Sequence, residues 1–213
     1  MTASSPSSVT LCIFEANTSY STDDRLQEAI RAYIHANLSD GAGAYPETAL
    51  RIHRTPLGKP YLPDCPSISI SASHSGKYLI CAVSDTAIGI DIQEQRLLNG
   101  ETPEQASIRL QRIARRFMHP AEAEYIAPLP CQRFFKVWTA KESYVKYTGQ
   151  GIDDQFSCFS VLPDGGIALQ DTISNDLSPQ WFALGVWFHQ FQLDPQHTVC
   201  ICTEDLAEIQ ICR

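Results

Sequence analysis

Two carboxylates lie in segments that contain many apolar residues, and they are the first candidates for chemistry. Asp91 belongs to the β-rich run AIGIDIQ (87–93), and Glu142 belongs to the helical segment FFKVWTAKESYVKYTG. A buried carboxylate is costly without a partner, and Mg²⁺ is a suitable one because it takes one or two carboxylates and completes its shell with water and substrate phosphates. For Asp91 the alternative is a cap or turn at the end of a strand.

The helical segment gathers its polar and apolar candidates on one face. Spacings of i, i+3, i+4, i+7 and i+8 place the following residues together: Trp138, Lys141, Glu142, Val145 and Lys146. A Glu–Lys pair one turn apart is also common on exposed helices, where it contributes only about 0.2–0.5 kcal/mol. Because these charges share the face of a tryptophan, the pattern is also compatible with the edge of a cleft.

Two loops offer groups that bind anions. The segment SASHSGKY (71–78) holds hydroxyl, imidazole, amide and ammonium donors in Ser73, His74, Ser75, Gly76 and Lys77. The loop at Gly58, Lys59 and Pro60 adds a second lysine. Such donors can hold phosphate oxygens, although the spacing of a P-loop is absent and an ordinary polar turn is the alternative.

The elements that must position these residues follow from periodicity and turn signals. We expect helices from 21–24 onward, over 102–117 and over 132–147, the last ending at Gly149. We expect strands at 9–14, 67–72, 78–84, 87–92, 155–161, 166–170, 181–188 and 197–202, with a hairpin turn at 163–166. This mixture predicts an α+β fold.

The motifs carry information through their order. GKPYLPD, SHSGKY, GIDI and WTAKESYVKYTGQGI resemble, in that order, the surfactin-synthetase-activating (Sfp) type of 4'-phosphopantetheinyl transferase, whose pattern runs GKPx(I/L)P, (I/V)SHSG, GIDIE and WxxKE(S/A)xxK. The resemblance covers about residues 51–161 and includes RRFMHPAEAEYI. It implies two similar α/β subdomains that form a pseudo-dimer around the active site, which we place at 1–90 (the coenzyme A loops) and 91–213 (the metal ligands and the WxxKE helix).

The same resemblance implies a reaction and roles for residues. The family moves the phosphopantetheine arm of coenzyme A to a serine of an apo carrier protein, uses Mg²⁺ and releases adenosine 3',5'-bisphosphate. By similarity Asp91 and Glu142 bind the metal, Glu142 also takes the serine proton, and Lys146 contacts the pyrophosphate. The nucleotide contacts fall on the loop residues Gly58, Lys59, Pro60, Ser73, His74, Ser75, Gly76 and Lys77, with Asp91 and Lys146 beside them.

Two departures from the family pattern affect these expectations. The third metal carboxylate of GIDIE is replaced by Gln93, which leaves an amide oxygen or a water in that place and predicts weaker metal binding. The segment before the GKP loop carries no basic helical cluster, so Arg51 and Arg54 are the candidates for the 3'-phosphate. A catalytically silent relative that binds coenzyme A or a carrier protein, and an unrelated metal-dependent nucleotide phosphotransferase, remain alternatives.

Charge and composition narrow the partners. The net charge of −8 argues against nucleic acid, and no apolar run approaches the roughly 20 residues that span a membrane. Residues 105–121 nevertheless lack acids, and Arg109, Arg112 and Arg116 form a helical row suited to an acidic carrier protein. Cysteines within apolar runs and the absence of an export signal predict buried thiols and a cytoplasmic protein, and the pseudo-dimeric fold predicts a monomer.

Overall fold

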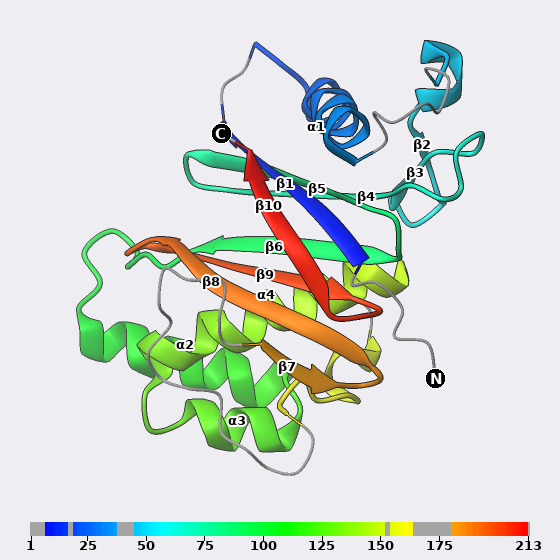
Figure 1. The fold of residues 1–213 in the computed structure, drawn as a ribbon. Helices are drawn as coiled ribbons and strands as arrows, with labels where there is room; N and C mark the ends of the chain where they lie inside the picture. Colours follow the sequence, from blue (N-terminus) through cyan, green and yellow to red (C-terminus); the bar gives the residue numbers. More distant parts are fainter. Residues whose placement is uncertain (1–6, 17–18, 38–44, 152–153, 164–179, 213) are drawn as a thin grey trace.

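The chain forms four layers in which two sheets pack face to face between helices (Figure 1). The computed structural model describes residues 7–16, 19–37, 45–151, 154–163 and 180–212. Helix α1 covers the outer face of one sheet, and helices α2, α3 and α4 cover the outer face of the other. Among the described residues, no helix has the length and apolarity that crossing a bilayer requires.

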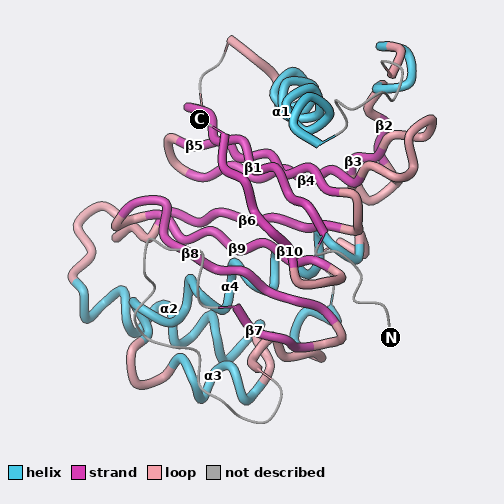
Figure 2. The backbone as a smooth tube through the Cα atoms, viewed as in Figure 1, coloured by secondary structure: helices cyan, strands magenta, loops and turns pink. Residues whose placement is uncertain are grey.

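The first sheet combines strands from both ends of the chain. Its order is β10-β1-β5-β4, and β10 runs parallel to β1. Its elements are β1 (Ser7–Glu15), α1 (Thr22–Asn37), β4 (Ser69–Ser75), β5 (Tyr78–Ser84) and β10 (Ala207–Cys212). Between α1 and β4 lie η1 (Glu47–Leu50), β2 (His53–Arg54) and β3 (Pro60–Tyr61). The strands of both sheets are drawn in magenta in Figure 2.

The second sheet is antiparallel, with the order β6-β9-β8-β7. Its strands are β6 (Ile88–Glu94), β7 (Gln180–Ala183), β8 (Val186–Asp194) and β9 (His197–Thr203). The covering helices are α2 (Pro103–Phe117), α3 (Pro120–Ile126) and α4 (Pro130–Thr148), and η2 (Asp154–Ser157) follows α4. The predicted α+β fold with two layered halves is therefore confirmed. The division of the chain into subdomains at residues 90 and 91 stays a prediction. In the structure this boundary falls inside β6, and β10, which follows it in the sequence, lies in the first sheet.

Several predicted elements need correction. Residues 155–161 form η2 and an irregular segment and not a strand, because Phe156 and Phe159 turn toward the buried Lys141. Residues 181–188 form parts of two strands joined by a turn at Leu184 and Gly185, whose φ angles are 55° and 78°. Helix α3 and strand β10 were not predicted. The strand at 166–170 and most of the hairpin turn at 163–166 lie outside the described residues.

A fully buried ion pair fixes α3 against α4. Lys141 of the WxxKE motif and Glu122 have completely buried side chains and lie 3.0 Å apart. Lys141 also donates to the carbonyl of Phe159 at 2.6 Å, and Glu122 accepts the amide of Val161 at 2.9 Å. Burial lowers the pKa of Lys141 and raises the pKa of Glu122, and their mutual attraction opposes both shifts. The motif lysine therefore holds the segment after α4 in place.

Replacing Lys141 with methionine is expected to destabilise the protein by about 3–5 kcal/mol, because Glu122 is left buried without its cation. Equilibrium unfolding in urea measures this change. The double variant Lys141→Met, Glu122→Gln is the control, and it should recover much of the loss because it leaves no unpaired charge. A Lys141→Met protein as stable as the wild type would contradict the assigned role of the pair.

Strand β6 approaches α4 unusually closely at Gly89. A Cβ atom placed there would lie 2.0 Å from the carbonyl oxygen of Ser143 and 2.3 Å from the amide nitrogen of Tyr147. The isoleucines at 88, 90 and 92 pack between the sheets, so the alternate positions face the helix. The GIDI sequence therefore places Asp91 on the face of β6 that lies against α4.

We expect Gly89→Ala to force the strand and helix apart and to cost at least about 3 kcal/mol, at the upper end of the range for overpacking. Gly100→Ala is the control, because its φ of 76° is strained for alanine but its Cβ would meet nothing within 4 Å. That control should cost only about 1–2 kcal/mol. Thermal or urea unfolding compares the two, and equal stability losses would contradict the close approach.

Candidate active site

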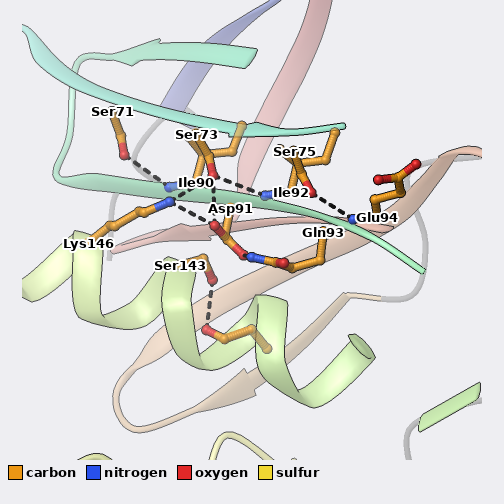
Figure 3. A network of polar contacts seen from close by, with 11 residues as sticks. Ser71, Ser73, Ser75, Ile90, Asp91, Ile92, Gln93, Glu94, Ser143 and Lys146 are labelled. Carbon is orange, nitrogen blue, oxygen red and sulfur yellow. Dashed lines mark hydrogen bonds and ion pairs between the residues drawn. The ribbon is translucent and has the colours of Figure 1, made fainter. Parts of the chain in front are cut away.

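Asp91 is the centre of a buried polar network where the two sheets meet α4 (Figure 3). Its side chain is only 2% exposed, and one carboxylate oxygen, Oδ1, accepts hydrogen bonds from Ser73 Oγ and Lys146 Nζ, both at 2.7 Å. Lys146 Nζ also donates to Ser73 Oγ at 2.8 Å. Residues from β4, β6 and α4 thus meet at one point, and Asp91 is not a cap at the end of a strand.

Glu142 lies one helical turn before Lys146, and the residue is 9% exposed. Among the described residues, its carboxylate has no hydrogen-bond or ion-pair partner. Burial raises the pKa of Glu142 to about 7, the negative charge of Asp91 adds to the rise, and Lys146 opposes it. The result is a carboxylate that changes charge near neutral pH beside a second carboxylate.

This arrangement fits a divalent cation. Two neighbouring carboxylates repel each other, and a metal ion between them would relieve the repulsion and partner Glu142. Gln93 donates its amide nitrogen to Asp91 Oδ2 at 3.1 Å, so the amide must turn over before its oxygen can face a cation. No group of three or more His, Cys, Asp or Glu suited to a metal occurs among the described residues. Any metal here would depend on two carboxylates and on ligands from the substrate.

A cleft of about 230 Å³ lies beside the network. Its lining joins the GKP loop to α4 and includes Gly58, Lys59, Pro60, Ser71, Lys146 and Arg54. Lys59 donates to the carbonyl of Tyr147, and burial lowers the pKa of its ammonium. Arg54 forms an ion pair with Asp23 and donates to the carbonyl of Gly58 at 3.1 Å. The described part of the cleft lining therefore contains three cationic side chains, of which Arg54 and Lys146 have carboxylate partners and would have to exchange them to bind an anion.

The SHSGK segment makes contacts within the protein, and its predicted role in nucleotide binding stays a prediction. The hydroxyls of Ser71, Ser73 and Ser75 on β4 accept backbone amides of β6, from Ile90, Ile92 and Glu94. We call this row of contacts the serine seam. Gly76 and Lys77 form the β4–β5 turn, where Lys77 lies 3.4 Å from Asp194, and His74 is exposed. None of the residues from 73 to 77 lines the cleft that contains Lys59 and Lys146.

Two residues were missed in the sequence. Ser71 lines the cleft, and the i, i+2 spacing of Ser71, Ser73 and Ser75 would have placed all three on one face of a strand. Glu122 is the ion-pair partner of Lys141. A glutamate at N3 of a helix is typical of a capping box, so no sequence signal indicated that this residue also pairs with a buried lysine.

Comparison of the sequence with known proteins indicates the family to which the chain belongs. The model of the 4'-phosphopantetheinyl transferase superfamily matches residues 87–202, just over half of the chain. A 4'-phosphopantetheinyl transferase of Bacillus subtilis is 37% identical over 114 residues, which are 51% of this chain and 46% of that protein. The transferase Sfp of Bacillus subtilis strain 168 is 28% identical over 159 residues, 72% of this chain and 62% of Sfp.

A third relative extends the match to another species. The transferase psf-1 of Bacillus pumilus is 31% identical over 156 residues, 70% of this chain and 59% of that protein. The chain spans between about half and three fifths of the length of these relatives. The matched region of the family model contains Asp91, Glu142 and Lys146. The chain belongs to the 4'-phosphopantetheinyl transferase superfamily.

Proposed function

We propose that this protein transfers the 4'-phosphopantetheine arm of coenzyme A to a serine hydroxyl of an apo acyl or peptidyl carrier protein. The observation that carries the proposal is the buried junction of Asp91, Glu142 and Lys146 beside the cationic cleft. The reaction separates a charged phosphate group from a pyrophosphate, and catalysis of such steps depends on positioning and on neutralising oxygen charges. Mg²⁺ held by Asp91 and Glu142 would neutralise charge on the pyrophosphate.

Residues of the chain would contact the phosphates and accept the proton. Lys146, 29% exposed, lines the cleft and can turn from Asp91 to the pyrophosphate. Lys59 and Arg54 supply further positive charge for the nucleotide phosphates, and His74 and Lys77 remain candidates at the turn. Glu142 would accept the proton of the serine hydroxyl, directly or through water, while the serine oxygen forms a bond to the phosphorus that carries pantetheine. The bond from that phosphorus to the adenosine bisphosphate breaks.

A catalytically silent relative is the weaker interpretation. Both carboxylates and Lys146 are present, and the raised pKa of Glu142 suits a group that exchanges a proton near neutral pH. The substitution at Gln93 removes one negative charge and is expected to weaken metal binding without removing the base. We keep the cytoplasm as the expected compartment and a monomer as the expected state, on the grounds of cysteine usage and the two-sheet fold.

Glu142→Gln should lower the transfer rate at least about 100-fold, because it removes both a metal ligand and the base. Incubation with coenzyme A, Mg²⁺ and an apo carrier protein, followed by mass spectrometry of the carrier, measures the transfer. The wild-type rate should rise between pH 6 and 8, because Glu142 loses its proton near pH 7 and only the carboxylate form can bind a cation or accept a proton. Glu124→Gln, an exposed change on α3, is the control. Near-normal transfer by Glu142→Gln would overturn the assignment.

We further propose that α2 docks the carrier protein. Arg112 and Arg116 are exposed on this helix, whereas Arg109 is held by Glu101 at 2.7 Å, so its charge is already neutralised. A shallow groove beside the helix includes Leu98, Ile108 and Arg112, and both apolar side chains are about half exposed. Carrier proteins of the kind this family serves are acidic helical bundles, and an apolar patch beside two exposed arginines complements such a surface.

Reversing both charges, Arg112→Glu and Arg116→Glu, should raise the KM for the carrier at least about tenfold and leave kcat nearly unchanged, because rim charges act on association. Steady-state kinetics at low ionic strength tests this. Arg115→Glu, exposed on the same helix but outside the row, is the matched control and should change KM much less. If the double reversal leaves KM unchanged, the carrier docks elsewhere.

A further inference from the structure

We propose that Cys12 and Cys212 form a site of oxidation, where a disulfide fastens the last strand of the structure to the first. Cys12 lies on β1 and Cys212 lies on β10, and these two strands run side by side and parallel (Figure 1). All eight cysteines are free thiols in the structure. The proposed disulfide is thus a modification of the reduced protein, and it does not depend on the transfer reaction.

The two cysteines are direct partners in the first sheet. Cys12 is paired with Cys212 in the register of β1 with β10. Neighbouring strands lie about 4.8 Å apart, and a disulfide joins residues whose Cα atoms are about 4.4–6.8 Å apart. Both side chains pack in the apolar cluster that includes Leu26 and Ile30 of α1, and the two thiols form a hydrogen bond. The two sulfur atoms therefore lie on the same face of the sheet and close to each other.

Cys81 on β5 is the competing partner for Cys12. It is paired with Cys12 on the other side of β1, and it packs in the same apolar cluster. Cys12 and Cys81 are only 4% and 0% exposed, whereas Cys212 is partly exposed on a strand at the edge of the sheet. An oxidant in solution therefore reaches Cys212 before the other two thiols, and this difference in access favours the pair of Cys212 with Cys12.

The reaction needs an oxidant, and a low-molecular-weight disulfide such as oxidised glutathione supplies one. The thiolate of Cys212 attacks one sulfur of the oxidant, forms a mixed disulfide and releases one glutathione thiolate. The sulfur of Cys12 then attacks the sulfur of Cys212, its proton passes to solvent, and the second glutathione thiolate leaves. The two protein thiols lose two electrons in total, and the oxidant is reduced to two molecules of thiol.

Burial of Cys12 makes the second step slow. It raises the pKa of Cys12 to about 12, and the neighbouring Cys212 adds to the rise. Because the thiolate is the attacking form, only a small fraction of Cys12 is reactive near neutral pH. We therefore expect the disulfide to close over minutes to hours, the range of uncatalysed disulfide rearrangement, and to close faster at higher pH.

The disulfide would act on the stability of the fold. Strand β10 follows β9 of the second sheet in the chain, so a bond from β10 to β1 ties the two sheets together. The bond also closes nearly the whole chain into one loop, and a long closed loop removes much of the freedom of the unfolded chain. Strands β5 and β4 lie between β1 and the serine seam, so the catalytic groups are expected to keep their places.

Oxidation of the protein with oxidised glutathione tests the proposal. Blocking of the remaining thiols, digestion without reductant and mass spectrometry identify the linked cysteines, and thermal unfolding followed by circular dichroism gives the midpoint. We expect a Cys12–Cys212 peptide pair and a midpoint at least about 5 °C above that of the reduced protein. Dithiothreitol should reverse both changes.

Two cysteine variants serve as the comparison. Cys212→Ser should form no linked pair with Cys12 and should show no rise in the midpoint on oxidation. Cys158→Ser removes an exposed thiol outside the pair and should behave like the wild type. A link between Cys12 and Cys81, a glutathione adduct on Cys212 that never resolves, or a Cys12–Cys212 link without a rise in the midpoint would each overturn the proposal.

Discussion

The contact between β6 and α4 at Gly89 is the constraint on which the site depends. Without a side chain at this position, the strand lies directly against the helix backbone near Ser143 and Tyr147. Asp91 is two residues further along the same face of the strand, so the contact brings its carboxylate to the helix that carries Glu142 and Lys146. A larger residue at 89 would separate the two elements, and the ion pair of Asp91 with Lys146 at 2.7 Å would be lost with them.

Helix α4 carries Lys141 and Lys146 on different sides, and their surroundings give them different roles. Lys141 is fully buried against Glu122 and aromatic rings, where it holds the fold. Lys146 is partly exposed, lines the cleft and contacts Asp91, so it can exchange its partner for a substrate phosphate. Burial thus separates a charge that stabilises the fold from one that is available for the proposed function, and the buried pair holds the helix that presents Lys146.

The sequence predicted the elements whose periodicity is strong, and it failed where tertiary contacts decide. Helix α4, its end at Gly149 and the run of β4, β5 and β6 follow from local patterns. The segment after α4 was predicted as a strand, but Lys141 and Glu122 hold it in another conformation. Motif order identified Asp91, Glu142 and Lys146. It could not show that Ser73 contacts Asp91, because that contact joins different sheets.

The central claim is that Asp91 and Glu142 share one metal ion, with the neutral Gln93 beside Asp91 in place of a third carboxylate. Anomalous diffraction from crystals grown with Mn²⁺ and coenzyme A tests it most directly. The account predicts one Mn²⁺ peak between the two carboxylates, with Lys146 moved from Asp91 to the pyrophosphate. Bound coenzyme A with no Mn²⁺ peak there, or with Lys146 still paired to Asp91, would contradict it.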